Sequence, residues 1–393
     1  MAKMLACPYC YEQFEIRSIL FRCRASQGNP TCPLTTDPVL RDKLGVTRDL
    51  GPVFRADGRK GTANCRACGT ETSHRACPAC HSRLPVQFGM VGSKMIAMAG
   101  AGRSGKTVYM TVVLHELKHR VGERFGAAIM GADEETKKQF EDSYEIPIYD
   151  KYRLPQTTMS AASRDRNHVP PLVFRFAART GKPLDGRPRH TLLSFFDTAG
   201  EDFSTQDKVE ENTRYLTSAD GILLLLDPLQ MAGGRRLAIP GAPLPSLPPV
   251  EQSPENILSR VTEILLARKR GTRSMISKPI AVVFTKVDAV WQHLDRGSPL
   301  RAQPPGGPSF DIADSLDVHE EIRHLLREWQ GSQISQILHN NYARYRFFGV
   351  SALGQPPAEA DRVAPSGIQP YRVADPLLWL LSEFGAIPKT GKG

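Results

Sequence analysis

The sequence predicts a three-layer α/β domain with a central, mainly parallel six-stranded sheet, preceded by a small cysteine-rich domain. Two observations predict this division. All eight cysteines lie between Cys7 and Cys80. From Lys94 onward, short apolar runs alternate with amphipathic stretches, the pattern of a parallel sheet covered by helices. We therefore expect a cysteine-rich domain at residues 1–88 and an α/β domain at residues 89–393.

The elements of the α/β domain follow from local patterns. Strands are expected at the apolar runs 94–99, 171–177, 190–196, 221–226, 279–285 and 345–350. The continuous run GILLLL suits a central strand buried on both faces. Helices are expected after Gly105, after Asp202, and at 255–269, 315–339 and 375–384. The third of these helices has a Ser253 cap and Pro254 at its first position. Two segments rich in Pro and Gly, near 228–254 and 296–310, are expected to be loops.

Composition excludes several classes of protein. The longest purely apolar run, Ile222 to Leu226, is far shorter than a membrane span, which needs roughly 20 residues. No apolar core of signal-peptide length precedes the first cysteines, so a cytoplasmic protein is expected. The formal net charge is +10. Two four-thiolate zinc sites would lower it to roughly +6, and the basic residues are scattered, so nucleic acid is not a favoured partner.

The cysteines form a pattern typical of zinc binding. Cys7/Cys10, Cys65/Cys68 and Cys77/Cys80 are three CxxC pairs, and Cys23 and Cys32 complete the eight. Two cysteines three residues apart on a tight turn direct both thiolates at one ion, and two such pairs close a tetrahedron. Pairing them in sequence order predicts one zinc site from Cys7, Cys10, Cys23 and Cys32, and a second from Cys65, Cys68, Cys77 and Cys80.

Other interpretations of the cysteines stay open at this point. An interleaved pairing would also fill two sites. His74 and His81 lie among the cysteines and could replace one of them, although eight thiolates already complete two shells. An iron–sulfur cluster and a core of free cysteines are further alternatives. Four thiolates leave no open position for chemistry, so the expected role of the zinc domain is folding and partner binding.

A phosphate-binding loop opens the α/β domain. The sequence Gly100-Ala101-Gly102-Arg103-Ser104-Gly105-Lys106-Thr107 fits GxxxxGK[ST], between a predicted strand and a predicted helix. The glycines let backbone N–H groups surround phosphates, and the helix N-terminus favours negative charge. Lys106 is expected to reach the β- and γ-phosphates, and the Thr107 hydroxyl to bind Mg²⁺. The strand ending at Asp197 supplies a second carboxylate for that Mg²⁺.

Three later motifs resemble those of Ras-like TRAFAC-class GTPases. Asp197-Thr198-Ala199-Gly200 resembles the DxxG motif, whose glycine contacts the γ-phosphate. Thr285-Lys286-Val287-Asp288 resembles [NT]KxD, whose carboxylate accepts hydrogen bonds from guanine. Ser351-Ala352 resembles the pair near guanine O6. The resemblance implies a three-layer P-loop GTPase domain that binds GTP or GDP with Mg²⁺, and it spans Gly100 to Ala352.

The catalytic residues are the weaker part of the resemblance. Thr157 or Thr158, with Thr158 preferred, lies where the family places its Mg²⁺-covering threonine. Glu201 stands where these enzymes usually carry a water-positioning glutamine. Because its charge would repel the γ-phosphate, hydrolysis is expected to be slow or to depend on a partner. Arg103, Arg235 and Arg236 are conceivable internal arginine donors, although a solvated surface position is expected for each.

The overall layout is similar to the bacterial double-GTPase family, including its final helix at Asp375-Pro376-Leu377-Leu378. The resemblance implies a GTP-hydrolysing switch in signalling or conflict systems, with the zinc domain as the interaction surface. A protein effector or activator is an expected partner, and a paired GTPase domain would lie on another chain. A non-hydrolysing GTP/GDP sensor or scaffold is the main alternative. An ATP-dependent enzyme, against which Asp288 argues, and a nucleotide-regulated nucleic-acid binder are the others.

Overall fold

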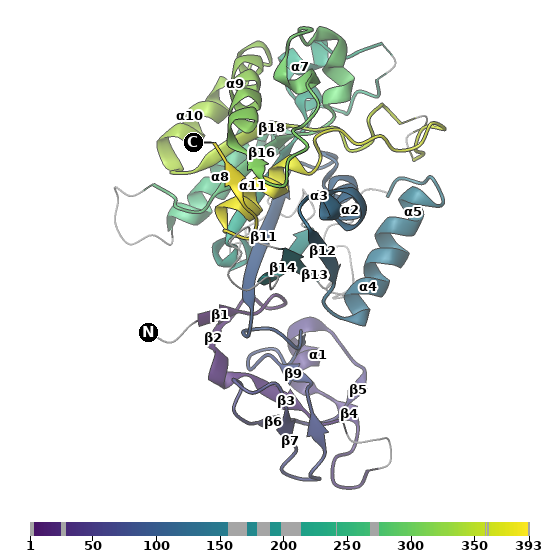
Figure 1. The fold of residues 1–393 in the computed structure, drawn as a ribbon, viewed down its shortest axis with the longest axis vertical. Coiled ribbons are helices and arrows are strands. Elements are labelled where there is room, and N and C mark those ends of the chain that lie inside the picture. Colours follow the sequence, from purple (N-terminus) through teal and green to yellow (C-terminus); the bar gives the residue numbers. More distant parts are fainter. Residues whose placement is uncertain are drawn as a thin grey trace.

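A computed structural model describes most of the chain. The described residues are 4–24, 29–155, 171–178, 189–197, 214–240, 242–267, 275–357, 359 and 361–391. Figure 1 shows two parts, with the cysteine-rich module below and the larger α/β domain above it. Among the described residues, every helix is too short or too polar to span a bilayer.

A seven-stranded sheet forms the middle layer of the α/β domain, in the order β12-β13-β14-β11-β15-β16-β18. The pairings from β14 through β11, β15 and β16 to β18 are parallel, and β13 runs antiparallel to both β12 and β14. The strands are β11 (Gly92–Gly100), β12 (Ala127–Gly131), β13 (Leu172–Ala178), β14 (Arg189–Asp197), β15 (Gly221–Leu226), β16 (Ile280–Phe284) and β18 (Tyr345–Gly349).

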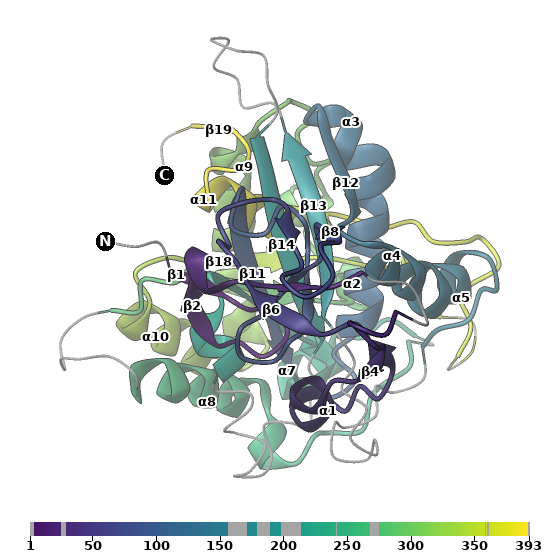
Figure 2. The same ribbon diagram turned by 90° about the horizontal axis from the view of Figure 1, so that it is seen from below.

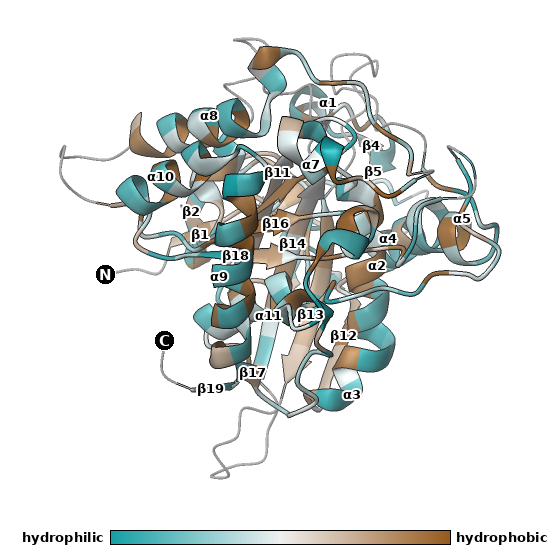
Figure 3. Ribbon diagram, turned by 90° about the horizontal axis from the view of Figure 1, so that it is seen from above, coloured by the Kyte–Doolittle hydropathy of each residue, from teal (hydrophilic) through white to brown (hydrophobic). Residues whose placement is uncertain are grey.

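Helices cover both faces of this sheet, because the apolar residues of its central strands alternate between two cores. Leu223 and Leu225 of β15 face the core under α2 (Lys106–Glu116) and α11 (Asp375–Glu383). Leu224 and Leu226 face the core under α8 (Pro254–Ala267), α9 (Ile312–Glu328) and α10 (Ser332–Asn341). Figure 2 shows the helices on either side of the strands, and Figure 3 shows the hydrophilic outer faces of α8, α9 and α10. The three-layer prediction is therefore confirmed.

The predicted and observed elements differ in three places. The sheet has seven strands rather than six, because β12 adds an edge strand to β13. The helix predicted at 315–339 is two helices, since Gln330 has a left-handed φ of 64° and Gly331 breaks the pattern after Trp329. A helical segment that the sequence analysis missed follows β12. It comprises α4 (Glu134–Phe140), a π-helical turn (Glu141–Glu145) and α5 (Ile146–Tyr149).

The two Pro- and Gly-rich segments, expected to be loops, contain only short helical turns in their described residues. They are the 3-10 turn Pro228–Gln230, α7 (Ala232–Arg236), and the 3-10 turns Val250–Gln252 and Pro299–Arg301. The second segment leads into β17 (Phe310–Asp311), which pairs with β19 (Lys389–Thr390). The cap predicted for α8 is present, since Ser253 Oγ accepts the Asn256 N–H at 3.3 Å.

The cysteine-rich module is built from very short strands. A four-stranded sheet has the order β10-β9-β3-β6, and three two-stranded ladders, β1-β2, β4-β5 and β7-β8, surround it. The elements are β1 (Met4–Ala6), β2 (Gln13–Glu15), β3 (Leu20–Arg22), β4 (Thr35–Thr36), α1 (Pro38–Leu44), β5 (Asp49–Leu50), β6 (Val53–Arg55), β7 (Ala63–Asn64), β8 (Glu71–Thr72), β9 (Arg75–Ala76) and β10 (Arg83–Leu84).

A buried histidine gives the α/β domain a pH-dependent stability. His319 of α9 accepts the Phe347 N–H through Nδ1 at 3.0 Å and lies against the Phe347 ring. Burial, with Arg346 and Arg323 nearby, lowers the pKa of His319 to about 4. The unfolded chain, with a histidine pKa of about 6.5, binds a proton that the native protein does not bind. The contribution of His319 to the free energy of unfolding is therefore complete only above the pKa of the unfolded chain. It falls by about 2 kcal/mol between pH 7 and pH 5.

Urea unfolding at these two pH values measures the effect. The variant His319→Gln has no titrating ring, so we expect its free energy of unfolding to depend less steeply on pH than that of the wild type. Comparing the two proteins at the same pH cancels any acid effect on the cysteine clusters. Equal slopes would show that His319 does not control the pH dependence.

Candidate functional site

The phosphate-binding loop lies between the central strand β11 and α2. Gly100, at its start, has a φ of 155°, and a Cβ there would lie 2.2 Å from Leu225 O of the neighbouring strand. Arg103 and Gly105 adopt left-handed conformations, with φ of 62° and 82°. Gly105 is also the N-cap of α2, so the loop ends at a helix N-terminus. This backbone has the closely curved form that a phosphate group requires.

Lys106 is folded over the loop. Its Nζ donates hydrogen bonds to Gly100 O at 3.0 Å and to Ala101 O at 2.9 Å, and the residue is buried. Ser104 Oγ is also buried, and none of the described residues forms a hydrogen bond with it. The loop thus holds a buried cation and an unsatisfied hydroxyl beside one another. Both are groups that the oxygens of a bound phosphate would satisfy, so the residues present fit a nucleotide phosphate.

Only some of the predicted Mg²⁺-binding and catalytic residues lie in the part of the chain that the structure describes. Thr107 follows Lys106 in the first turn of α2 and is half-buried. Asp197 is the last residue of β14, where its backbone is in register with Met98 of β11, close to the start of the loop. The side chain of Asp197 lies outside the described atoms. Thr157, Thr158, Gly200 and Glu201 lie outside the described residues.

The TKVD motif is joined directly to the phosphate-binding loop. Thr285 Oγ1 donates to Ser104 O at 2.9 Å, and Lys286 Nζ donates to Arg103 O at 3.0 Å. Lys286 has a left-handed φ of 56°, which turns the chain after β16. Burial raises the pKa of the Asp288 carboxyl above its usual range, while a hydrogen bond with Ser351 opposes that rise. Two motifs 180 residues apart in the chain therefore form one continuous surface.

Ser351 and Ala352 complete this surface beyond β18. Ser351 exchanges two backbone hydrogen bonds with Tyr371, at 3.0 and 2.8 Å, and its hydroxyl accepts the Gly354 N–H at 2.8 Å. Next to Tyr371, the buried Arg372 makes ion pairs with Asp314 at 2.7 Å and Asp375 at 2.8 Å. These contacts anchor the loop that follows Ser351 to α9 and α11. The loop is thus held in a fixed position beside Asp288.

Two residues of the site, Asp227 and Gln230, were not predicted from the sequence. Asp227, directly after β15, is fully buried, accepts the Leu229 N–H at 2.9 Å and pairs with Lys286 Nζ. Gln230 Nε2 donates to Gly102 O at 2.8 Å. The apolar run that ends in an aspartate, GILLLLD, was the available signal for Asp227. No sequence signal indicated Gln230, because its place depends on the turn that Asp227 caps.

The first Pro-rich segment lies against the phosphate-binding loop. Arg103 Nη1 is 3.5 Å from Ser246 Oγ of this segment. Arg235, considered as an internal arginine donor, gives hydrogen bonds to the carbonyls of Leu229 and Pro245 within the same segment. Arg236 is exposed. The segment therefore contributes backbone and polar contacts to the rim of the loop.

The eight cysteines form two clusters, and the sequential pairing was wrong. Cys7 and Cys10 lie with Cys77 and Cys80, whereas Cys23 and Cys32 lie with Cys65 and Cys68. The reason is the antiparallel pairing of β3 with β9, which matches Leu20 with Ala76. The cysteines after β9 consequently lie near the start of β3, beside the first CxxC pair, and Cys23 lies at the opposite end. The interleaved alternative is the one that the structure shows.

The spacing of the sulfur atoms fits zinc. A tetrahedral ion with Zn–S bonds of ~2.3 Å separates its ligand sulfurs by about 3.8 Å. Cys7–Cys80 and Cys10–Cys77 are each 3.8 Å apart, Cys32–Cys65 is 3.7 Å and Cys23–Cys68 is 3.5 Å. All eight thiols are free of disulfide bonds. Both clusters are therefore formed as four-thiolate zinc sites require.

Each CxxC pair lies on the same kind of turn. The residue after the second cysteine is left-handed in all three, with φ of 62° at Tyr11, 73° at Gly69 and 60° at His81. In the first and last pairs, a backbone N–H also donates to the first sulfur, from Tyr9 at 3.4 Å and from Ala79 at 3.3 Å. Such turns direct two thiolates to one point. His81 instead bonds Asp37 at 3.0 Å through Nδ1, and neither His81 nor His74 belongs to a cysteine cluster.

Comparison with known proteins identifies the larger domain. The sequence model of the family described as Double-GTPase 2 matches residues 94–329, more than half of the chain. The chain belongs to the double-GTPase 2 family. The match confirms the resemblance on which the GTPase interpretation was based. The chain is also 26% identical, over 98% of its length and the whole of the other protein, to the candidate ESX-1 scaffolding and assembly protein SaeC of Mycolicibacterium smegmatis.

The zinc module contacts the GTPase domain just after the DxxG region. Tyr11, beside Cys10, accepts a hydrogen bond from Ser218 Oγ at 3.3 Å, and its ring lies 5.5 Å from that of Tyr215. Glu12 pairs with Arg214 at 3.1 Å. Tyr215 in turn donates to Ile96 O and accepts from Met98 N of β11. The helical residues 214–218 therefore connect the first CxxC turn to the strand that carries the phosphate-binding loop.

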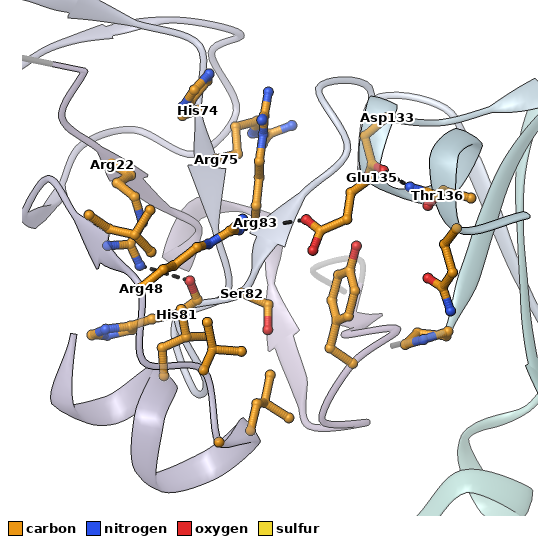
Figure 4. Close-up of a pocket in the computed structure, with 18 residues that line it drawn as sticks. Arg22, Arg48, His74, Arg75, His81, Ser82, Arg83, Asp133, Glu135 and Thr136 are labelled. Carbon is orange, nitrogen blue, oxygen red and sulfur yellow. Dashed lines mark hydrogen bonds and ion pairs between the residues drawn. The ribbon is translucent and has the colours of Figure 1, made fainter. Parts of the chain in front are cut away.

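A cavity of about 520 Å³ lies at the same junction, farther toward α4. Figure 4 shows two basic residues of the module, Arg48 and Arg83, on the side of the cavity toward Asp133 and Glu135 of the GTPase domain. Arg48 and Glu135 form an ion pair at 3.6 Å. The two domains therefore present opposite charges to one another, which fixes their relative orientation more than it adds stability.

Proposed function

We propose that this protein is a Mg²⁺-dependent GTP-binding protein that hydrolyses GTP slowly and acts as a nucleotide switch. Membership of the double-GTPase 2 family supports guanine nucleotide as the ligand. The observation that carries the proposal is the direct bonding of Thr285 and Lys286 to the carbonyls of Ser104 and Arg103. Asp288 belongs to the same motif as Thr285 and Lys286, so this bonding holds its carboxylate near the phosphate-binding loop. In the proposed site this carboxylate selects guanine.

Each part of the proposed site has a defined role. Gly100, Ala101, Gly102, Arg103, Ser104 and Gly105 surround the phosphates, and Lys106 neutralises their charge. Thr107 and Asp197 would hold Mg²⁺, which supplies further neutralisation of phosphate charge when bound. Gly200 would contact the γ-phosphate, Thr158 would cover the Mg²⁺ ion, and Glu201 would stand at the place of the attacking water. Thr285, Lys286, Asp288, Ser351 and Ala352 form the guanine pocket.

The zinc module is the proposed interaction surface of the switch. Its first CxxC turn contacts residues 214–218, which follow the DxxG segment expected to respond to the γ-phosphate. Two zinc ions hold this module in its folded form. The relative named for scaffolding and assembly favours protein partners in a bacterial assembly process. The proposed location of this process is the cytoplasm. An activator, or a second GTPase on another chain, is the proposed source of faster hydrolysis.

A scaffold that binds GTP or GDP without turnover is the second candidate. Glu201 favours it, because a carboxylate in the water-positioning place repels the γ-phosphate. The relative with a scaffolding name is a further reason to consider it.

Phosphate release tests the proposal. We expect the purified protein with Mg²⁺ to release phosphate slowly from GTP and not from ATP, and Lys106→Ala to lose this activity. Lys137→Ala, an exposed lysine of α4, is the matched control and is expected to behave as wild type. Glu201→Gln is expected to raise the rate, since it removes the repelling charge. GTP binding without any release in all variants would establish the scaffold, and release from ATP would contradict guanine selection.

A further inference from the structure

Two histidines and a glutamate meet on the GTPase domain away from both cysteine clusters. His115 lies near the end of α2, and His119 follows one turn later in the π-helical turn Leu117–Val121. Glu145 ends the π-helical turn between α4 and α5. One possible ligand atom of each residue lies within 4.8 Å of those of the other two. The phosphate-binding residues are at the opposite end of α2, so the nucleotide site does not use this group.

The distances in the group suit a metal ion. Three ligands bound tetrahedrally at ~2.1 Å from an ion lie about 3.4 Å from one another. His115 Nδ1 is 2.7 Å from Glu145 Oε1, and His119 Nε2 is 4.0 Å from the same oxygen. One of these distances is shorter, and the other longer, than the spacing between ligand atoms in a tetrahedral site. A small opening of the first contact and a small closing of the second would place all three atoms around one ion.

The surroundings orient the ligands. Lys118 Nζ bonds Glu145 Oε2 at 3.0 Å, which leaves Oε1 directed at the histidines. The His115 ring stacks on Tyr149 at 3.7 Å, and this fixes its plane. Glu145 is mostly buried, and hydrogen bonds from His115 and then Lys118 lower its pKa to about 2. Burial and the neighbouring His115 and Lys118 lower the pKa of His119.

The helix geometry is a second observation that points to a site. Both polypeptide segments that supply the ligands are π-helical at this place. Such turns are rare, their hydrogen bonding is less favourable than that of an α-helix, and they occur often at functional sites. In a regular α-helix His115 and His119 would also share one face, but the wider turn changes the angle between their rings. Side-chain contacts of Glu145 with Lys118 and His119 join the two turns.

We propose that His115, His119 and Glu145 form a further metal site, which binds Zn²⁺ or a similar borderline divalent transition ion. Two imidazoles and one carboxylate are a ligand set that zinc accepts, and His119, at half exposure, leaves the fourth position open to water. The ion would tie the C-terminal end of the P-loop helix α2 to the segment that leads through α5 to residue 155. The site therefore connects the phosphate-binding helix with the chain that precedes Thr157 and Thr158.

Titration calorimetry on the full chain, with its cysteine sites already filled with zinc, tests the proposal. We expect one further Zn²⁺ to bind per chain and to raise the melting temperature. His119→Ala and Glu145→Gln should each weaken this binding by at least ~10-fold, since even groups that only support a ligand have such effects. His119 is the preferred position because its exposure makes misfolding of the variant improbable. Circular dichroism of each variant checks the fold.

His324→Ala is the matched control. His324 of α9 is exposed and also lies one turn from a carboxylate, 3.8 Å from Glu328. Among the described residues, no third possible ligand lies close enough to complete a metal site with this pair. The control should bind the additional zinc as the wild type does. Absence of a further zinc in the wild type would overturn the proposal. Unchanged binding in His119→Ala would overturn it too, as would equal losses in His324→Ala, since scattered surface histidines would then explain the binding.

Discussion

Replacing Asp288 by alanine is expected to weaken GTP binding by about 10²- to 10⁴-fold. In the proposed guanine pocket the carboxylate would accept two hydrogen bonds from the base, and each bond to a charged group contributes ~1.5–3 kcal/mol. A loss of ~3–6 kcal/mol corresponds to this range of dissociation constants. Adenine offers no such pair of donors, so ATP binding should stay weak and unchanged. Fluorescence competition with a labelled guanine nucleotide measures both affinities.

The structure supplies a control for this substitution. Asp295 lies seven residues later and is exposed, so Asp295→Ala removes the same charge without reaching the proposed pocket. It should bind GTP as the wild type does. Asp288 also bonds Ser351, so the melting temperature of Asp288→Ala must be compared with that of the wild type. If a folded Asp288→Ala variant kept wild-type GTP affinity, the proposed guanine pocket would be wrong.

Removing a single cysteine ligand is expected to expose the other three thiols of its own cluster. In Cys10→Ser, the thiols of Cys7, Cys77 and Cys80 should react rapidly with an alkylating reagent, and the zinc content should fall by one ion per chain. A structural zinc site contributes ~10–16 kcal/mol of apparent binding energy, so its loss unfolds the turns that it holds. Mass spectrometry of the alkylated peptides identifies the reactive positions.

The reciprocal variant gives the opposite pattern. Cys68→Ser should expose Cys23, Cys32 and Cys65, and leave the first cluster protected. Sequential pairing would instead couple Cys10 to Cys23 and Cys32, and Cys68 to Cys77 and Cys80. Exposure of Cys23 and Cys32 in the Cys10→Ser variant would therefore contradict the interleaved clusters.

Local motifs were predictable from the sequence, because their geometry depends on neighbouring residues. The glycines of the loop at 100–105, the cap at Ser253 and the apolar strands each carry their own signal. All six predicted strands are present within one or two residues of the expected ends, although the edge strand β12 was missed. This strand, AAIMG, has only five residues and contains no β-branched residue other than Ile129, and its pairing with β13 decides its structure. The helix α4 has an Asp133 cap, but its surface residues are mostly polar and lack a clear periodicity.

Contacts between distant segments were not predictable. The cysteine clusters depend on the pairing of β3 with β9, which no local pattern records. Likewise, Gln230 reaches the phosphate-binding loop only because Asp227 caps a turn after β15. The group of His115, His119 and Glu145 depends on contacts between the end of α2, with the turn after it, and the turn that follows α4. In each case the sequence contained the residues, and the tertiary fold determined their partners.

The affinity of the unmodified protein for GTP, ITP and ATP tests the central claim most directly. Inosine keeps the N1–H of guanine and lacks its 2-amino group, so it offers Asp288 one hydrogen bond in place of two. Equilibrium competition in the presence of Mg²⁺ should give the order GTP, then ITP about 10-fold or more weaker, then ATP weakest. Equal affinity for the three nucleotides, or a preference for ATP, would contradict the assignment of a guanine-binding switch.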